Sequence, residues 1–344
     1  MSEQSTVPVS IDQYLSQPLT VGEPITSGPL TIFPVFGPDP GIPYVSLKDA
    51  IENGNLTVKE LPGGASVRDL VVENPGRHNV LVFEGEEVLG ARQNRTFDIS
   101  VLIPSGARIT VPVSCVEAGR WDGMRHGEAF ASSPQTADPR LRGSKVRQSH
   151  RARMAGQEAR ADQSEVWMEV SERAREVGVS SPTESLNDVH VSRGEQLRRM
   201  VRSIELQPGQ VGMIAAAGDE IIAADLVSRP EVFEELFLPL LHGYALDALA
   251  SGAREADVSA ETAREFIDHA TSTRILEGDG IGMGRDFRFE EATLVGAGLI
   301  SGEELIQFSV FPAERQSDRD RGNDARPVAQ RRTRIRRPSQ RRDS

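Results

Sequence analysis

Short runs of alternating apolar and polar residues dominate residues 29–121, and Gly, Pro and Asn separate them. Such runs are typical of strands with one buried face, because successive side chains of a strand point to opposite faces. The first run, residues 30–33, is predicted to stop at Pro34. Many short strands with turns between them predict an antiparallel β-rich core, either sandwich-like or barrel-like.

One turn pattern occurs three times, each time after an apolar run. A glycine is followed by two acidic and two aliphatic residues, beginning at Gly85, Gly218 and Gly302. Glycine at a tight turn between such runs is a hairpin signal, so the sequence predicts three hairpins. The flanking residues differ, which favours shared turn chemistry over a duplication.

Helical periodicity replaces strand alternation after residue 160. Apolar residues recur every three or four positions in residues 162–177, 195–204, 230–249 and 259–272. Pro239 is predicted to kink or divide the third helix, because a proline removes a helix hydrogen bond. These helices, together with the antiparallel core on which they are expected to pack, predict an α+β fold.

The predicted organisation is a single α+β domain over residues 29–311. It consists of a β-rich part (29–121), a polar Arg-rich connection with some helix that is a candidate mobile flap (122–160), and a part with helices and hairpins (161–311). Residues 1–28 are predicted to be loosely ordered. Residues 312–344 are predicted to form a disordered Arg-rich tail, because they have almost no large apolar side chain.

Charge is distributed unevenly along the chain. The net charge is −12, but residues 312–344 contain eleven Arg and five acidic residues, which leaves 28 basic and 46 acidic residues elsewhere. An acidic body repels nucleic acid, so nucleic acid is not expected as a partner except through the tail.

Three further features concern the cellular compartment. No apolar run approaches the roughly 18 residues that cross a bilayer, so no membrane partner is expected. The N-terminus lacks the pattern of a signal peptide, and a single cysteine fits a reducing compartment. We therefore expect a cytoplasmic protein.

Unusual polar residues gather around two predicted strands, residues 95–101 and 109–117. Cys115 and Glu117 lie on the same face of the second strand. If Gly85 turns a hairpin, antiparallel geometry places the polar residues before the first strand at that same end. The predicted ligand-binding residues are Gln93, Asn94, Arg95, Cys115, Glu117, Arg120 and Trp121.

Each of these residues also has a purely structural interpretation. Cys115 continues an apolar face, which favours an inert buried cysteine over a nucleophile that would need a base such as His126. Glu117 and Arg95 can form an ion pair at the end of the core, and Arg120 can stack on Trp121. The two amides can simply build a turn.

Other candidate chemistry is weaker. Asp225, at the end of an apolar run, is predicted to cap the following helix or to face a pocket. The six histidines show no metal-ligand spacing, so no metal site is predicted. The glycine-rich residues 278–284 lack the Lys-Ser/Thr of a phosphate-binding loop. The sequence identifies no cofactor.

Residues 84–95 and 111–121 resemble the ARG and Rhodanese-Phosphatase-superfamily-associated protein family. The string Cys-Val-Glu-Ala-Gly-Arg-Trp at 115–121 is the most specific part. Three stretches within 163–167, 211–247 and 285–289 also look like this family. The family is named for its neighbours, which include ADP-ribosyl glycohydrolases. The resemblance therefore implies a role near ADP-ribose or NAD-derived metabolism, and it carries over no catalytic residues.

The hypothesis from these observations is a binding module for a nucleotide-like or sugar-phosphate molecule such as ADP-ribose. Arg95 and Arg120 would meet phosphate, Trp121 would stack on a ring, and the amides and Glu117 would take hydroxyls or amides. Two alternatives stay open. One is a hydrolase with Cys115 as nucleophile or Glu117 as general base, and the other is a structural module in a protein complex.

Overall fold

The computed structural model describes residues 8–38, 41–61, 66, 68–90, 92–120, 130–253 and 256–313. In this part, one 3-10 helix and six α-helices are present: η1 (Ile11–Tyr14), α1 (Leu47–Glu52), α2 (Pro139–Met154), α3 (Gln163–Glu176), α4 (Leu186–Val201), α5 (Pro230–Ser251) and α6 (Ala260–Ser272). The strands, almost all paired antiparallel, are β1 (Val9–Ser10), β2 (Thr20–Val21), β3 (Ile25–Ser27), β4 (Leu30–Phe36), β5 (Tyr44–Ser46), β6 (Thr57–Lys59), β7 (Asp69–Glu73), β8 (Asn79–Val82), β9 (Glu86–Gly90), β10 (Arg95–Phe97), β11 (Val101–Ile103), β12 (Arg108–Cys115), β13 (Phe130–Thr136), β14 (Gly212–Ala217), β15 (Glu220–Val227), β16 (Arg274–Ile275), β17 (Glu277–Asp279), β18 (Arg285–Glu290), β19 (Leu294–Ser301) and β20 (Glu304–Pro312). The predicted α+β class is confirmed.

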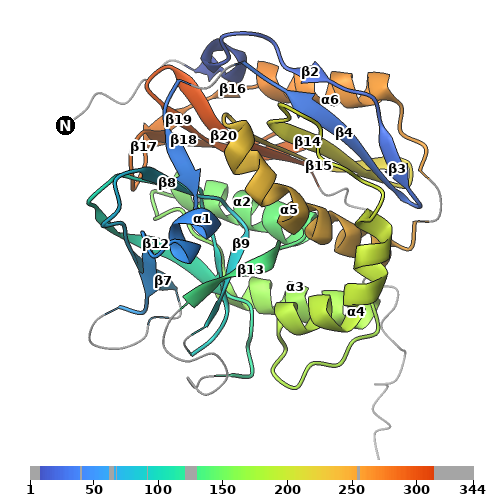
Figure 1. The fold of residues 1–344 in the computed structure, drawn as a ribbon, viewed down its shortest axis with the longest axis horizontal. Coiled ribbons are helices and arrows are strands. Elements are labelled where there is room, and N and C mark those ends of the chain that lie inside the picture. Colours follow the sequence, from blue (N-terminus) through green and yellow to red (C-terminus); the bar gives the residue numbers. More distant parts are fainter. Residues whose placement is uncertain are drawn as a thin grey trace, which may run out of the picture. The chain divides into compact units, whose positions relative to one another are not determined.

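The largest sheet has nine strands and two differently covered faces. Its order is β17-β18-β19-β20-β15-β14-β4-β2, and β3 also pairs with β4. Ile32 and Phe33, neighbours on β4, pack into different hydrophobic clusters, as strand alternation requires. Helix α6 and η1 cover the Phe33 face, and α2 and α5 cover the Ile32 face (Figure 1).

A second β part is built from two smaller sheets. These are the six-stranded sheet β13-β9-β10-β12-β7-β6 and the three-stranded sheet β11-β8-β5. Val72 and Val111 of the larger sheet share one buried cluster with Val80 and Val101 of the smaller, so the two sheets pack against each other. Helix α5 contacts β13 as well as β14, and it therefore connects this part with the nine-stranded sheet (Figure 1).

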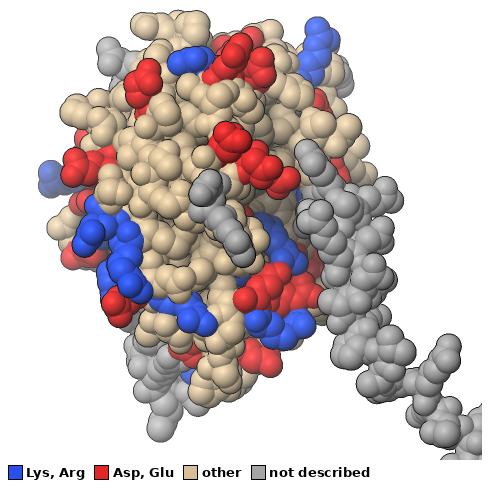
Figure 2. All heavy atoms as spheres, turned by 90° about the vertical axis from the view of Figure 1, so that its right-hand side faces the viewer, with Lys and Arg blue, Asp and Glu red and all other residues tan. Residues whose placement is uncertain are grey.

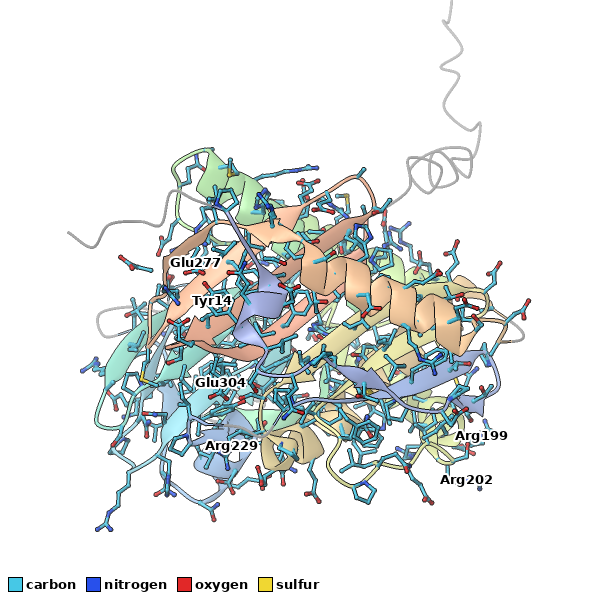
Figure 3. The ribbon with its side chains drawn as sticks, turned by 90° about the horizontal axis from the view of Figure 1, so that it is seen from above. Tyr14, Arg199, Arg202, Arg229, Glu277 and Glu304 are labelled. Carbon is cyan, nitrogen blue, oxygen red and sulfur yellow. The ribbon has the colours of Figure 1, made fainter. Side chains whose placement is uncertain are left out.

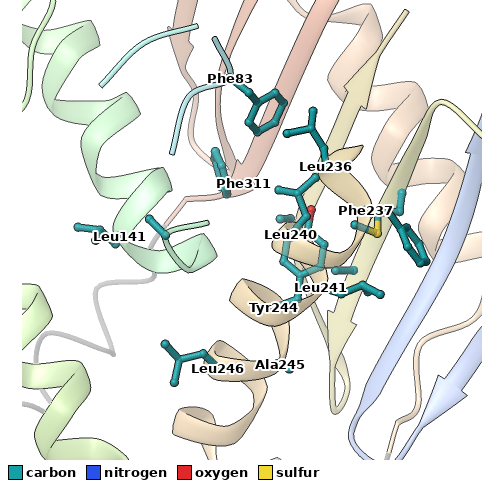
Figure 4. Close-up of a cluster of buried hydrophobic side chains, with 14 of the residues drawn as sticks. Phe83, Leu141, Leu236, Phe237, Leu240, Leu241, Tyr244, Ala245, Leu246 and Phe311 are labelled. Carbon is teal, nitrogen blue, oxygen red and sulfur yellow. The ribbon is translucent and has the colours of Figure 1, made fainter. Parts of the chain in front are cut away.

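Helix α5 is a single helix that continues through Pro239, so the chain is not divided there. Leu236, Leu240 and Tyr244, on both sides of the proline, are buried. They belong to one cluster with Phe311, which Figure 4 shows. The burial of this face outweighs the one helix hydrogen bond that the proline removes.

The other predicted helices are present as well. Asp162 and Ser259 cap α3 and α6 by accepting hydrogen bonds from first-turn N–H groups. Helix α4 begins at Leu186, earlier than predicted, and Leu186 and Val189 are buried. Its first turns mix these apolar residues with polar ones, which hid the helical periodicity.

Two of the three predicted hairpins form, at Gly218 and Gly302. The hairpin at Gly85 is wrong, because β8 pairs with β5 and β11 whereas β9 pairs with β10 and β13. Gly85 has a φ of 86°, and its backbone bonds to Phe97 and Ala137. A turn between two sheets uses the same positive-φ glycine as a hairpin does, so the local sequence does not distinguish them.

Two strand boundaries also differ from the prediction. The strand predicted over 95–101 is interrupted after Phe97 and continues as β11 in another sheet. Conversely, β4 continues past Pro34. The carbonyl of Pro34 accepts a hydrogen bond from Gly22 N–H (2.8 Å), on the outer side of β4. The nitrogen of Pro34, which carries no hydrogen, faces the same side, just beyond the end of β2, so no sheet hydrogen bond is lost there.

The predicted Arg-rich connection contains β13 and the 16-residue helix α2; within it, residues 122–129 lie outside the described part. Arg142 and Lys145 of α2 have no exposed surface. Asp225 and Asp98 form ion pairs with them, at 2.7 and 3.1 Å. The sequence predicted some helix here, but hydrophobic patterning did not show that this helix is buried, because inward positions are charged and each charge is matched from a distant part of the chain.

Residues 8–28, predicted to be loosely ordered, contain η1 and three short strands. Strands β2 and β3 pair with β4, and β1 pairs with β16. Ile11 and Tyr14 of η1 are buried in the cluster on the Phe33 face. These two side chains are the reason why a polar segment is held against the sheet.

The described residues belong to the unit Met1–Ala313, and the predicted disordered tail falls almost entirely on residues 314–344, outside them. On the face in Figure 2, acidic and basic side chains are interspersed among uncharged ones. Within the described part, the structure contains no helix of the length and apolar character that crossing a membrane requires.

Candidate functional site

The polar residues that were predicted to gather at one end of the sheet lie together. Strand β10 pairs with both β9 and β12, and Arg95 lies opposite Cys115. Gln93 and Asn94 belong to the turn between β9 and β10. This turn, rather than a hairpin at Gly85, brings the residues to the Cys115 end of β12.

Glu117 is the centre of this polar cluster. Its Oε2 accepts hydrogen bonds from Arg120 Nη2 (2.7 Å) and from the N–H of Asn94 (3.2 Å), and its Oε1 accepts one from the Thr183 hydroxyl (2.9 Å). Its main-chain carbonyl accepts from Gln93 Nε2 (2.9 Å). Glu117 therefore ties the β9–β10 turn to the end of β12 and to the loop before α4.

Cys115 is fully buried against the start of α3. Its main-chain N–H and C=O both bond to the side-chain amide of Gln163, at 2.8 Å each. Burial raises the pKa of the Cys115 thiol, and the nearby charge of Arg95 only partly opposes this. The thiol therefore stays protonated at neutral pH, which makes it a poor nucleophile.

Glu117 and Arg95 are charged residues of the same cluster. Burial alone would raise the pKa of Glu117, but the hydrogen bonds from Arg120, Asn94 and Thr183 outweigh it and hold this pKa below its usual range. Arg95 is fully buried, with Nη2 3.8 Å from Glu60 Oε1. A carboxylate with a low pKa is a weak base, so Glu117 is better suited to holding a hydrogen-bond donor than to removing a proton.

Two amide atoms in the cluster have unused hydrogen-bonding capacity. Gln93 Oε1 and Asn94 Nδ2 are buried, and neither has a hydrogen-bond partner among the residues that the structure describes. The orientation of the Asn94 amide follows from its Oδ1, which accepts from Arg120 Nη2 (3.2 Å) and from Gly90 N–H (3.4 Å). One buried donor and one buried acceptor thus remain at this end of the sheet.

Two residues of the prediction cannot be placed in this way. Trp121, predicted to stack on a ligand or on Arg120, lies outside the described residues, as does His126. Their roles stay predictions. In the described ranges, no group of three or more His, Cys, Asp or Glu side chains is arranged to hold a metal ion.

The sequence model of the ARG and Rhodanese-Phosphatase-superfamily-associated Protein domain matches residues 18–311. The chain belongs to this family. The match includes all the described residues of the polar cluster. No curated protein and no solved structure matches the chain.

Two stretches that carry the resemblance to this family contact each other although they are far apart in sequence. Gln163, which opens one stretch, holds the backbone of Cys115 in another. Within a third stretch, Tyr244 donates a hydrogen bond to Asp225. The sequence pattern had marked Gln163 without assigning it to the site, whereas Thr183 lies in a loop that no local motif marks.

In this family member, Asp225 does not cap α5. It forms a bidentate ion pair with Arg142, with both N–O distances 2.7 Å, and both side chains have no exposed surface. Arg142 Nε also donates to Glu84 Oε1 at 3.3 Å, and burial raises the pKa of that carboxyl. This second polar cluster is enclosed between α2, α5 and the nine-stranded sheet, and Arg142 pairs with both of its carboxylates.

Proposed function

We propose that this chain is a binding domain for a small nucleotide-like or sugar-phosphate molecule, with ADP-ribose as the first candidate. The observation that carries the proposal is the pair of buried amides. Gln93 Oε1 and Asn94 Nδ2 lack partners among the described residues, although the side chains are 3% and 0% exposed.

Burying a polar group without a partner costs about 1–3 kcal/mol, so folded proteins rarely leave such groups unused. A ribose hydroxyl both donates and accepts hydrogen bonds. It would satisfy the acceptor of Gln93 and the donor of Asn94 together. The unused atoms are therefore matched by the hydroxyls of a sugar.

The guanidiniums of the same cluster supply the complementary charge for phosphate. Arg120 and Arg95 are 5% and 0% exposed, and charge-assisted hydrogen bonds are strong where water is excluded. Arg95 Nη2 lies 3.8 Å from Glu60 Oε1, so a bound phosphate would compete with that carboxylate for the guanidinium. Entry of a ligand requires the buried end of the sheet to open, so we expect slow association.

The electrostatics favour binding over the hydrolase alternative. The pKa of Cys115 is raised by burial and that of Glu117 is lowered by its hydrogen bonds. A protonated thiol and a weakly basic carboxylate are poorly prepared for nucleophilic or general-base catalysis. The family name, which refers to neighbouring proteins, adds context for ADP-ribose but identifies no reaction.

A thermal-shift titration with ADP-ribose, NAD and related nucleotides tests the proposal. A ligand that binds only the native state must raise the Tm. We expect the rise with ADP-ribose to be lost in Arg95→Ala and kept in Arg108→Ala, a control at the exposed end of the neighbouring strand β12. If Arg95→Ala does not fold, Arg95→Lys keeps the charge and removes the planar fork.

The outcomes separate the remaining interpretations. No shift with any nucleotide would overturn the proposal and favour the structural module. A shift that survives in both Arg95 variants would show that the ligand binds elsewhere.

A further inference from the structure

The polar cluster is almost closed to solvent, and Glu117 at its centre has no exposed surface. Two hollows, of about 400 and 260 Å³, lie beside the segment that follows η1, and no residue of the cluster lines either of them. Tyr14 and Glu304, which line the smaller hollow, lie well apart from Arg199 and Arg202 of α4 (Figure 3). A ligand of the cluster therefore reaches it only after part of the protein has moved.

The loop that connects α3 with α4 covers one side of the cluster (Figure 1). We call residues 178–185 the α3–α4 loop. The Thr183 hydroxyl donates a hydrogen bond to Glu117 Oε1 (2.9 Å), and the Thr183 carbonyl accepts one from Gly119 N–H (2.8 Å). Directly after the loop, Leu186 N–H donates to the Val116 carbonyl (2.9 Å). These bonds join the loop to residues on both sides of Glu117 in the chain.

No space is left between the loop and the chain that follows β12. A Cβ added to Gly119 would lie 2.9 Å from the Thr183 Cα, which is closer than two carbon atoms approach without a clash. The two backbones are therefore in direct contact, and only a residue without a side chain allows so close an approach. A ligand cannot pass between them while the loop stays in place.

Helix α3 covers the cluster from another direction but is attached more firmly. Val166 and Val170 of α3 are buried in the core, and both amide atoms of Gln163 bond to the Cys115 backbone. By contrast, every second residue of the loop from 178 to 184 is exposed. Among the described loop residues, Val179 is the apolar side chain that packs on the core. Moving the loop therefore uncovers far less apolar surface than moving α3.

The loop also contains a backbone conformation that works against closure. Glu184 has a φ of 51°, and no other non-glycine residue in the described part of the chain has a positive φ. A residue with a Cβ is strained in this left-handed region. The conformation is imposed from nearby, because Ser181 Oγ accepts a hydrogen bond from Ser185 N–H (2.9 Å) and Thr183 is bonded to Glu117. An open loop can leave this conformation, so the strain favours opening.

We propose that the α3–α4 loop is a gate over the polar cluster, and that the hydrogen bond from Thr183 to Glu117 is its latch. The loop opens between Gly178 and Leu186 while α3, α4 and β12 stay folded. Opening makes Glu117 Oε1 available, so a ligand hydroxyl can take the place that the Thr183 hydroxyl occupies in the closed state. Which molecule enters rests on the proposed function, whereas the movement itself does not.

Hydrogen exchange at Gly119 and Leu186 tests the movement without any ligand. Both N–H groups donate across the closing contact, so each exchanges only when the loop opens or the whole domain unfolds. Mass spectrometry with fragmentation distinguishes these amides from those of the buried strand β19. Below the unfolding transition, guanidinium should change exchange at Gly119 and Leu186 little and accelerate exchange in β19 steeply, because local opening exposes little surface.

Two variants should change the gate in opposite directions. Thr183→Val keeps the shape of the side chain and removes the donor, so exchange at Gly119 should be about tenfold faster. Ser180→Ala, at an exposed position of the same loop, should leave it unchanged. Glu184→Asn relieves the strain, since Asn adopts the left-handed conformation more readily, and exchange should be about threefold slower. Glu184→Gln removes the charge but keeps the strain, and it is the matched control.

Stopped-flow mixing with ADP-ribose tests whether the gate controls entry. The association rate should rise in Thr183→Val and fall in Glu184→Asn, in step with hydrogen exchange. An association rate that is the same in both variants would show that the ligand enters by another route, and it would overturn the gate.

The exchange results decide the proposal independently of any nucleotide. The gate is wrong if Gly119 and Leu186 exchange only with global unfolding, or if Thr183→Val exchanges no faster than Ser180→Ala. Where Thr183→Val does not fold, equal exchange in Glu184→Asn and Glu184→Gln overturns it in the same way. If exchange follows the expectation and no nucleotide binds, the proposed function fails and the gate stands.

Discussion

Replacing Arg142 by methionine removes the basic partner from the buried cluster around Asp225. The wild-type guanidinium makes two 2.7 Å bonds to that carboxylate and has Phe83 and Phe311 rings 5.1 and 5.0 Å from its centre. Methionine replaces the arginine side chain only as far as Nε, so it keeps part of the packing against the rings. The larger loss is electrostatic, because Asp225 keeps a buried charge without its cation.

The expected magnitude follows from the burial of both partners. Removing one member of a fully buried ion pair costs about 3–5 kcal/mol. Hydrogen bonds from Tyr244 and Ser309 to Asp225 remain in the variant, so we expect the lower end, about 3 kcal/mol. The double variant Arg142→Met/Asp225→Asn removes both charges and should recover at least about half of the loss.

Arg140→Met is the matched control in the same helix. Arg140 pairs with Glu172 and Glu176 at 2.9 and 2.8 Å, but its side chain is 38% exposed, so its loss should cost about 0–1 kcal/mol. Guanidinium unfolding at pH 7, followed by fluorescence and near-ultraviolet circular dichroism, measures all three variants. Coincident transitions with unchanged m-values are required before the free energies are compared.

Either of two results would refute this reasoning. One is a decrease in the free energy of unfolding of Arg142→Met that is no larger than that of Arg140→Met. The buried pair would then contribute no more to stability than a surface pair. The other is a double variant as unstable as Arg142→Met alone, because the loss would then come from packing rather than from an unpaired charge.

Three further predictions concern Glu87, Cys115 and Gly282. Burial raises the pKa of Glu87 to about 7, so the protonated form stabilises the native state and stability is lost as the pH rises from about 4.5 through 7. Denaturant titrations measure the free energy of unfolding at each pH. Relative to the wild type, the value for Glu87→Gln should rise by up to about 3 kcal/mol as the pH increases from 4.5 to 8. The Cys115 thiol should be almost unreactive toward an aromatic disulfide reagent at pH 8 in the native protein and react rapidly in guanidinium. Gly282→Ala should destabilise the domain by about 1–3 kcal/mol in thermal unfolding, since an added Cβ would lie 2.3 Å from the Leu102 carbonyl oxygen.

Each of these has a result that contradicts it. A stability difference between Glu87→Gln and wild type that does not change with pH would mean that Glu87 does not titrate in this range. Rapid modification of Cys115 without denaturant would show that the end of β12 is open to solvent. An unchanged Tm for Gly282→Ala would show that the backbone around Leu102 moves aside easily.

Much of the polar cluster could be predicted from local sequence. Strand alternation places Cys115 and Glu117 on one face, and antiparallel pairing brings Arg95 opposite Cys115. The expected route through a hairpin at Gly85 was wrong, yet the turn formed by Gln93 and Asn94 produces the same juxtaposition. Local geometry was sufficient here because the residues involved lie on neighbouring strands.

The roles within the cluster depended on contacts from elsewhere in the chain. Thr183 and Gln163 approach from the helical part and decide how Glu117 and Cys115 are hydrogen-bonded. Their separations along the chain are 66 residues for Glu117–Thr183 and 48 for Cys115–Gln163. No local pattern specifies such pairs.

The sequence by itself determined the α+β class, most of the helices and strands, and the gathering of polar residues near Cys115. Periodicity carries this information because it reports which face of each element is apolar. Only the tertiary structure decided which strands share a sheet at Gly85, and that α2 is buried with Arg142 and Lys145 inside. A buried charge is tolerated only where an opposite charge meets it, and the partner of Arg142 lies 83 residues away at Asp225.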